Sequence, residues 1–133
     1  MKSLLIIITL FTFSNISIAQ SIVPISIKVT YVACSIETVF AIPCSLFDSS
    51  FSNDKEYGEL KNSEITKMGA SLKNFVKIKT KGIDVRGKIQ FTSNRHTYKY
   101  CFDCAGIFTD GVNLYKNPKL FLLLKKRFRS LNF

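Results

Sequence analysis

Two stretches of this chain alternate between apolar and polar residues, and this alternation limits the possible folds more than any other feature. In the first stretch, residues 24–33, the apolar positions are Ile25, Ile27, Val29 and Tyr31. In the second, the positions expected to point inward are Ile83, Val85, Gly87, Ile89 and Phe91, and those expected to point outward are Asp84, Arg86, Lys88 and Gln90. Because successive side chains of a strand point to opposite faces, a period of two predicts half-buried strands. The chain therefore needs a sheet with one face against a core.

Shorter segments supply the other predicted strands. Residues 36–40 form a β-rich run that we expect to be the second strand of the chain. Residues 97–102 alternate again after a hairpin connection at residues 93–96. Two further short strands are expected at residues 107–108 and 112–115, which are separated by turn residues.

Two helices complete the predicted order β-β-α-β-β-β-β-α. Apolar residues recur at helical spacing over residues 62–77, and Asn117 followed by Pro118 is typical of a helix start. The second helix is expected to run to about residue 128 and to be basic and amphipathic. Consecutive strands joined by short turns favour an antiparallel sheet with helices on one face. The predicted fold class is α+β, a small antiparallel sheet with two helices packed on one face.

The first nineteen residues resemble a secretory signal peptide. Lys2 is the only charged residue, an apolar stretch follows, and Ser17 and Ala19 place small residues three and one before a cut ahead of Gln20. An uncleaved anchor is the alternative. The chain has 133 residues, which is room for one small core rather than two. We therefore expect a signal peptide at 1–19, a single α+β domain at 20–133, and an exported (periplasmic or extracellular) protein with no transmembrane span after cleavage.

Cys34, Cys44, Cys101 and Cys104 form an even set in a chain expected to be exported, which favours two disulfides. Three pairings are possible. We slightly favour a bridge that ties the N-terminal region to the Cys101 hairpin, such as Cys44–Cys101, over the local pairs Cys34–Cys44 and Cys101–Cys104. A redox dithiol at Cys101–Cys104 is less favoured because the motif leaves a strand rather than starting a helix. A four-cysteine zinc site is disfavoured by the wide spacing of the first pair.

The charge is strongly polarised along the chain. The whole sequence has a net charge of +10. Residues 20–64 carry 3 lysines against 6 acidic residues, whereas residues 65–133 carry 15 basic residues against 3 acidic ones. The anion-binding candidates are Lys73, Lys77, Lys79, Lys81, Arg86, Lys88, Lys125, Lys126, Arg127 and Arg129. An anionic lipid, an acidic glycan or an acidic protein would fit these cations, and export makes nucleic acid a poor candidate. The alternative is a solvated basic surface with no partner.

The sequence contains no recognisable catalytic constellation. His96 is the only histidine, and no nucleophile or orienting carboxylate is identifiable for it. We predict no catalytic residue, no metal site and no cofactor, and interpret the protein as a non-enzymatic binder of an anionic partner or envelope surface. One alternative is an inhibitor or immunity-type protein acting on an extracytoplasmic enzyme. Its contact would be residues 45–58, a predicted loop anchored by Phe47 and Phe51. The third interpretation is a redox protein that uses the CxxC motif.

Several segments resemble short exported bacterial proteins of unknown function. They are the N-terminal signal, the strand Ile83-Asp84-Val85-Arg86, the Cys101 strand that runs into Gly106, and the turn from Gly111 to Lys119 with its basic helix. The resemblance covers about the last fifty residues. It implies no activity and no site residues.

Overall fold

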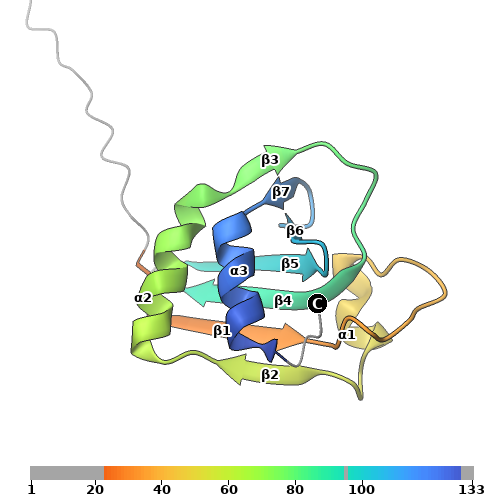
Figure 1. Ribbon diagram of the computed structural model, residues 1–133, viewed down its shortest axis with the longest axis horizontal. Helices are drawn as coiled ribbons and strands as arrows, with labels where there is room; N and C mark the ends of the chain where they lie inside the picture. The colour runs from red at the N-terminus through yellow and green to blue at the C-terminus, as the bar shows by residue number, and fades with distance from the viewer. Residues whose placement is uncertain (1–22, 95, 130–133) are drawn as a thin grey trace, which may run out of the picture.

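The computed structural model describes residues 23–94 and 96–129. The predicted signal peptide lies outside the described residues. The described chain forms one seven-stranded antiparallel sheet in the order β2-β1-β4-β5-β6-β7-β3 (Figure 1). The strands are β1 (Ser26–Tyr31), β2 (Glu56–Glu59), β3 (Val76–Ile78), β4 (Val85–Thr92), β5 (Thr97–Asp103), β6 (Ile107–Thr109) and β7 (Leu114–Lys116). The helices are α1 (Phe47–Ser50), α2 (Asn62–Ser71) and α3 (Pro118–Arg127), with 3₁₀ turns η1 (Cys44–Leu46) and η2 (Leu72–Asn74). The α+β class is confirmed.

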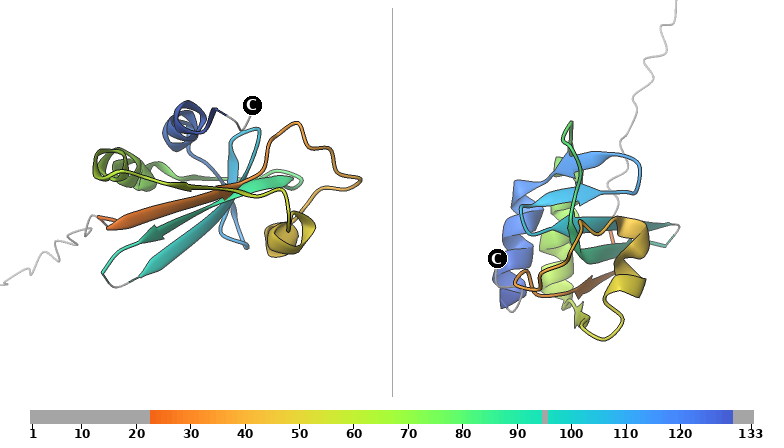
Figure 2. Two further views of the ribbon diagram at one scale, coloured as in Figure 1. Left: turned by 90° about the horizontal axis from the view of Figure 1, so that it is seen from below. Right: turned by 90° about the vertical axis from the view of Figure 1, so that its right-hand side faces the viewer.

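Helices α2 and α3 lie side by side on one face of the sheet, whereas α1 lies on the other (Figures 1 and 2). The two long helices are antiparallel. The Asn117 amide at the start of α3 donates to the carbonyl of Ser71 at the end of α2, at 2.8 Å. At the opposite ends, Arg127 Nε lies 2.7 Å from Glu64 Oε1. Among the described residues no helix is long and apolar enough to cross a bilayer.

Both long helices begin at positions where side chains satisfy free backbone N–H groups. The carboxylate of Glu64 accepts from the backbone N–H of Lys61 at 3.0 Å, just before α2. Asn117 Oδ1 accepts from the N–H of Leu120 at 3.0 Å, and Pro118 occupies the first helical position. The start predicted for the second helix is therefore confirmed.

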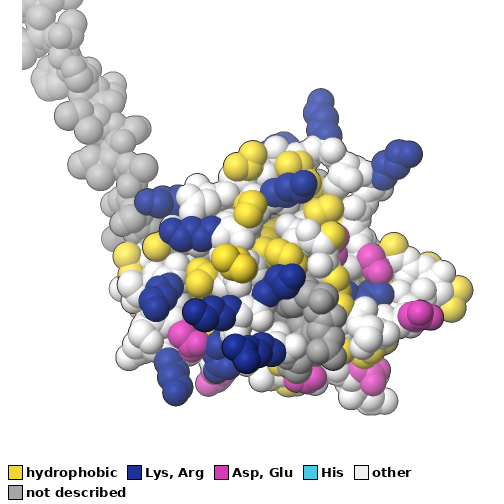
Figure 3. Space-filling view, in the orientation of Figure 1, with side chains coloured by type: hydrophobic (Ala, Val, Ile, Leu, Met, Phe, Trp, Pro, Cys, Tyr) yellow, Lys and Arg dark blue, Asp and Glu magenta, His cyan; other side chains and the backbone are white. Residues whose placement is uncertain are grey.

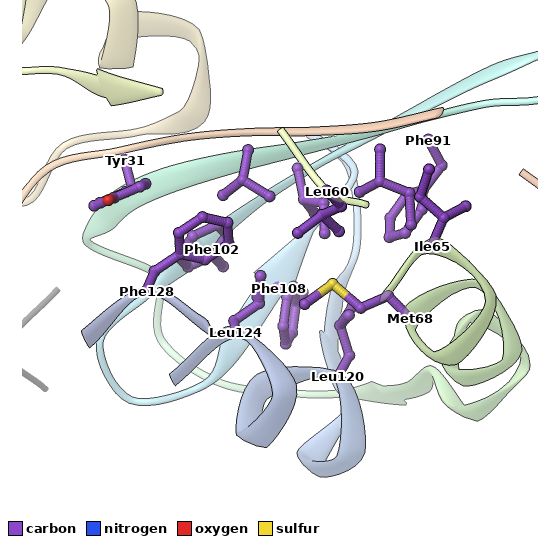
Figure 4. Close-up of a cluster of buried hydrophobic side chains, with 13 residues drawn as sticks. Tyr31, Leu60, Ile65, Met68, Phe91, Phe102, Phe108, Leu120, Leu124 and Phe128 are labelled. Carbon is purple, nitrogen blue, oxygen red and sulfur yellow. The ribbon is translucent and has the colours of Figure 1, made fainter. Parts of the chain in front are cut away.

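The main core lies between the sheet and the α2–α3 layer (Figure 4). Leu120 and Leu124 of α3 are fully buried and point at Phe102 and Phe108 of the sheet, with Met68 of α2 beside them. The helix stripe therefore faces the sheet, which is the docking role of an amphipathic helix. Burial of one such leucine is worth about 1.5–3 kcal/mol.

A second core lies on the opposite face, under α1. Phe47 and Phe51 are buried there, as predicted, against Val32, Val85 and the half-cystine Cys101. The segment 45–58 was expected to be mostly loop, but it contains α1 and the start of β2. The two phenylalanines are four residues apart, so one helical turn places both rings against the sheet.

Two element boundaries differ from the prediction. Residues 36–40 form no strand; β2 and β4 occupy both edges of β1, the strand that precedes these residues in the chain. The helix predicted over 62–77 ends at Ser71 and gives way to η2 and β3. Phe75 instead stacks on Tyr100, with ring centroids 4.4 Å apart. Tertiary packing and strand pairing therefore override the helical period at its C-terminal end.

Candidate functional site

The solvent-facing side of the α2–α3 layer carries several exposed basic side chains. Since Leu120 and Leu124 face the core, the outer side of α3 presents Lys119, Leu122 and Lys126. Leu122 is 67% exposed. Lys and Arg side chains spread over this face, and its upper part, over β3 and β7, shows no acidic side chain (Figure 3).

A shallow groove runs between the two helices. It has a volume of about 230 Å³ and is lined by Glu64, Lys67, Met68, Leu123, Lys126 and Arg127. Lys67 and Lys126 come from different helices and flank a floor formed in part by Met68 and Leu123. Glu64 is the only acidic residue in the two helices, and it is already bound to Arg127 and to the backbone of Lys61. The groove therefore offers apolar contact with two cations beside it.

Two more predicted cations extend this surface toward β3. Lys73 lies in η2, directly after α2, and is exposed. Lys77 pairs in register with Tyr115 of β7, whose ring packs against the core under the helices. Residues directly opposite each other share a face of the sheet, so Lys77 lies on the helical side. We call this surface, made of Lys67, Lys73, Lys77, Lys119, Leu122, Lys125, Lys126 and Arg127, the helical face.

The ten predicted anion-binding residues thus divide between several places. Five of them belong to the helical face: Lys73, Lys77, Lys125, Lys126 and Arg127. Lys79 and Lys81 are exposed in the connection from β3 to β4, and Arg129 is exposed just after α3. Lys88 lies on the opposite face of the sheet and forms an ion pair with Asp48 of α1. That pair lowers the pKa of Asp48.

Arg86 was expected to point outward, but it is buried, with only 5% of its surface exposed. Its guanidinium contacts Asp84 at 2.7 Å, Thr38 Oγ1 at 3.0 Å and the ring of Phe51 at 5.4 Å. Its strand face is the predicted one, but α1 and residues 33–43 cover that face at this end of β4. This position removes Arg86 from the surface that a ligand can reach.

All four cysteines form long-range disulfides. Cys44 pairs with Cys101 and Cys34 with Cys104, with Cα separations of 5.7 and 6.0 Å. The favoured long bridge is confirmed, and the local pairing is wrong. Cys101 and Cys104 belong to different bridges, so they do not form the CxxC disulfide of a redox dithiol. Both bridges join the N-terminal third of the chain to the end of β5.

The face of the sheet opposite the helices carries a second hollow, beside α1. Its volume is about 1070 Å³. Lys28, Gln90 and Lys99 line it in one row across β1, β4 and β5, because Lys28 pairs with Gln90 and Gln90 with Lys99. Lys28 and Lys99 were absent from the predicted anion-binding set, as was Lys67. Lys28 and Lys99 occupy outward positions of alternating strands, and this pattern is the sequence signal that predicts their exposure.

Two carboxylates shape turns near these surfaces. Burial raises the pKa of Asp103, although its Oδ1 accepts from the backbone N–H groups of Ile107 and Ala105 at 2.8 and 2.9 Å. Asp110 accepts from Asn113 and Tyr115 in the β6–β7 turn. That hydrogen bond to Asp110 raises the pKa of the Tyr115 hydroxyl. Both arrangements position strands rather than a reacting group.

The fold and these surfaces define a two-disulfide α+β protein with a basic helical face on one side and, on the other, a hollow lined by both polar and apolar residues. No protein-family model matches the chain. No curated protein and no solved structure matches it either. The resemblance to short exported bacterial proteins therefore stays a prediction.

Proposed function

We propose that the protein is an exported, non-enzymatic binding protein whose helical face docks on an anionic lipid surface. The two disulfides indicate a non-reducing environment. The observation that carries the proposal is the charge of the α2–α3 layer. Its single acidic residue, Glu64, is already paired, whereas Lys67, Lys119 and Lys126 form no ion pair within the described residues.

The exposed leucine in this surface favours a lipid over a soluble polyanion. Leu122 lies between Lys119 and Lys126 on the outer side of α3. Burial of such a side chain at the boundary between head groups and acyl chains is favourable, and the flanking lysines can contact the phosphates at the same time. An acidic glycan would use the lysines but would gain little from Leu122.

Vesicle co-sedimentation tests the proposal. Vesicles containing phosphatidylglycerol should bind the protein at low salt and release it at high salt, and pure phosphatidylcholine vesicles should not bind it. Replacing Lys67, Lys119 and Lys126 by Gln should weaken binding by about 3 kcal/mol, or roughly 100-fold, at about 1 kcal/mol per lysine. Leu122→Ser should weaken vesicle binding but leave retention on a heparin column unchanged.

A charge-matched control separates the helical face from net charge. Lys28, Lys99 and Lys116 are exposed on other parts of the described surface, and replacing all three by Gln removes the same number of charges. This control should bind vesicles nearly as well as wild type. Equal losses in the two triple variants would refute a specific helical face. Loss of heparin retention alone would assign the face to a glycan instead.

A further inference from the structure

The loop that connects β1 to η1 extends beyond the end of the sheet and displays apolar side chains at its tip. Residues 33–43 project past the strand ends (Figures 1 and 2). Val39 is fully exposed, and Phe40 is 63% exposed. Hydrophobic side chains occupy the far end of this projection in the space-filling view (Figure 3). An exposed phenylalanine beside an exposed valine in a convex loop is unfavourable in water unless a partner covers it.

Both arms of the loop are fixed to the sheet, so the tip is held rather than free. On the first arm, Thr38 Oγ1 accepts from Arg86 Nη2 at 3.0 Å. On the second arm, the N–H of Ile42 donates to Asp84 Oδ1 at 2.9 Å, and the carbonyl of Ile42 accepts from the N–H of Val85 at 2.8 Å. Ile42 itself is buried. Buried Arg86 and partly exposed Asp84 therefore hold both arms at once, which gives this ion pair a structural role.

The two disulfides fix the loop at its base. Cys34 stands at its start and Cys44 directly after it, and each is bonded to the end of β5. Only Val39, Phe40 and Ala41 lie between the two hydrogen-bonded arms, and all three are exposed. A segment that is already ordered loses little conformational entropy when a partner binds it. The loop therefore has the properties of a pre-organised binding element.

The chemistry of the loop selects a protein cleft over a membrane. Residues 33–43 contain Glu37 and no basic residue, so an anionic bilayer would repel the loop rather than attract it. A convex loop needs a concave partner with an apolar pocket. Peptidases bind substrates in such clefts and read one side chain in a specificity pocket, and complexes of peptidases with rigid inhibitor loops are among the tightest known.

We propose that residues 38–42 occupy the substrate cleft of an extracytoplasmic peptidase that prefers apolar side chains, with Phe40 in its specificity pocket. This assigns the inhibitor role to the loop at 33–43 rather than to the predicted segment 45–58, whose phenylalanines are buried. Hydrolysis of the Phe40–Ala41 bond would add water across the C–N bond and leave a carboxylate and an amine. Both new ends would stay attached through the disulfides and the sheet, so a cut would not release the loop.

The test measures inhibition of chymotrypsin and subtilisin, which prefer apolar residues, with chromogenic peptide substrates. Wild-type protein should inhibit at least one of them competitively. Phe40→Ala should raise its inhibition constant at least tenfold, as truncation of a central interface aromatic does. Val112→Ala is the matched control, because Val112 is 87% exposed in the β6–β7 turn and lies outside the loop. It should inhibit as wild type does. Thr38→Ala should raise the inhibition constant less and speed cleavage of the loop.

Several results would overturn the proposal. These are no inhibition of either peptidase at high micromolar protein, equal losses in Phe40→Ala and Val112→Ala, or rapid cleavage at the tip without inhibition. Analytical sedimentation of wild type and Phe40→Ala tests whether a second copy of this chain covers the tip. A dimer that is lost in the variant would assign the tip to that copy. Weaker vesicle binding by Phe40→Ala would assign it to a membrane. None of these results bears on Lys67, Lys119 and Lys126, so the helical face is tested separately.

Discussion

Removal of either disulfide should destabilise the protein by less than the length of its loop implies, because the two bridges are nested. Cys44–Cys101 spans 57 residues, and Cys34–Cys104 spans 70 and encloses it. In the chain-entropy treatment, either loop closed alone stabilises the folded state by about 4 kcal/mol. The two values do not add, since each bridge shortens the loop that the other must close.

The stabilisation by one bridge depends on the length of the loop that it still closes when the other bridge is present. With Cys44–Cys101 intact, the outer bridge closes only the segments 34–44 and 101–104, a difference of 13 residues between the two spans. Closing a loop of that length is worth about 3 kcal/mol. The same reasoning gives about 3 kcal/mol for the inner bridge when the outer one is present. Loss of both should therefore cost about 7 kcal/mol, which approaches the full stability of a typical domain.

Guanidinium titrations of three variants measure these losses in the free energy of unfolding. They are Cys34→Ala with Cys104→Ala, Cys44→Ala with Cys101→Ala, and all four replacements. Because the unfolded chain expands when a cross-link is lost, the m-value should rise in each variant, and free energies must be extrapolated to water. Cys101 is only 1% exposed, so the inner pair should cost slightly more than the outer one. Single losses above 4 kcal/mol that add in the fourfold variant would refute the nested-loop reasoning, as would losses below 1 kcal/mol.

Other consequences concern single residues. Gly87→Ala should destabilise by about 1–3 kcal/mol in thermal melts, because an added Cβ would fall on the buried ring of Phe102, and a null effect would contradict this packing. Asn117→Ala should cost about 1–2 kcal/mol in urea titrations, since it removes the helix cap and the hydrogen bond to Ser71. Asp103 has a raised pKa, so the unfolded state loses its proton first as the pH rises, and stability falls between the ordinary and the raised pKa. Asp103→Asn should abolish that fall; a pH profile parallel to that of wild type would contradict it.

Local patterns in the sequence were sufficient for part of the fold. Alternation located β1, β4 and β5, because these strands are half-buried and their side chains follow the pleat. The Asn117-Pro118 pair located the start of α3, because capping depends only on neighbouring residues. The favoured bridge Cys44–Cys101 also agreed with the structure. Its partner Cys34–Cys104 then followed from the number of cysteines.

What the sequence did not predict depends on contacts between distant segments. Residues 36–40 have β propensity, but they lie in the loop that extends beyond the end of the sheet, and nothing local to them reveals that. Arg86 occupies an outward position of its strand, as a surface residue would, yet α1 and residues 33–43 cover it and its guanidinium pairs with Asp84. Lys67 was missed because α2 contains few cations. It belongs to the helical face because the fold brings Lys126 of α3 to the other side of the same groove. Sequence alone identifies which charges exist, and the fold decides which of them face a partner.

The polarised charge of the sequence is only partly neutralised by folding. Two ion pairs in the described chain join the acidic first third to the basic remainder, Asp48 with Lys88 and Glu64 with Arg127. Each acid is thereby used to hold an element in place, α1 against β4 and the start of α2 against the end of α3. Lys67, Lys119 and Lys126 of the helical face gain no such acidic partner within the described residues. Since structural pairs are close and partly shielded while the lysines are exposed, salt should weaken binding to an anionic surface well before it affects folding.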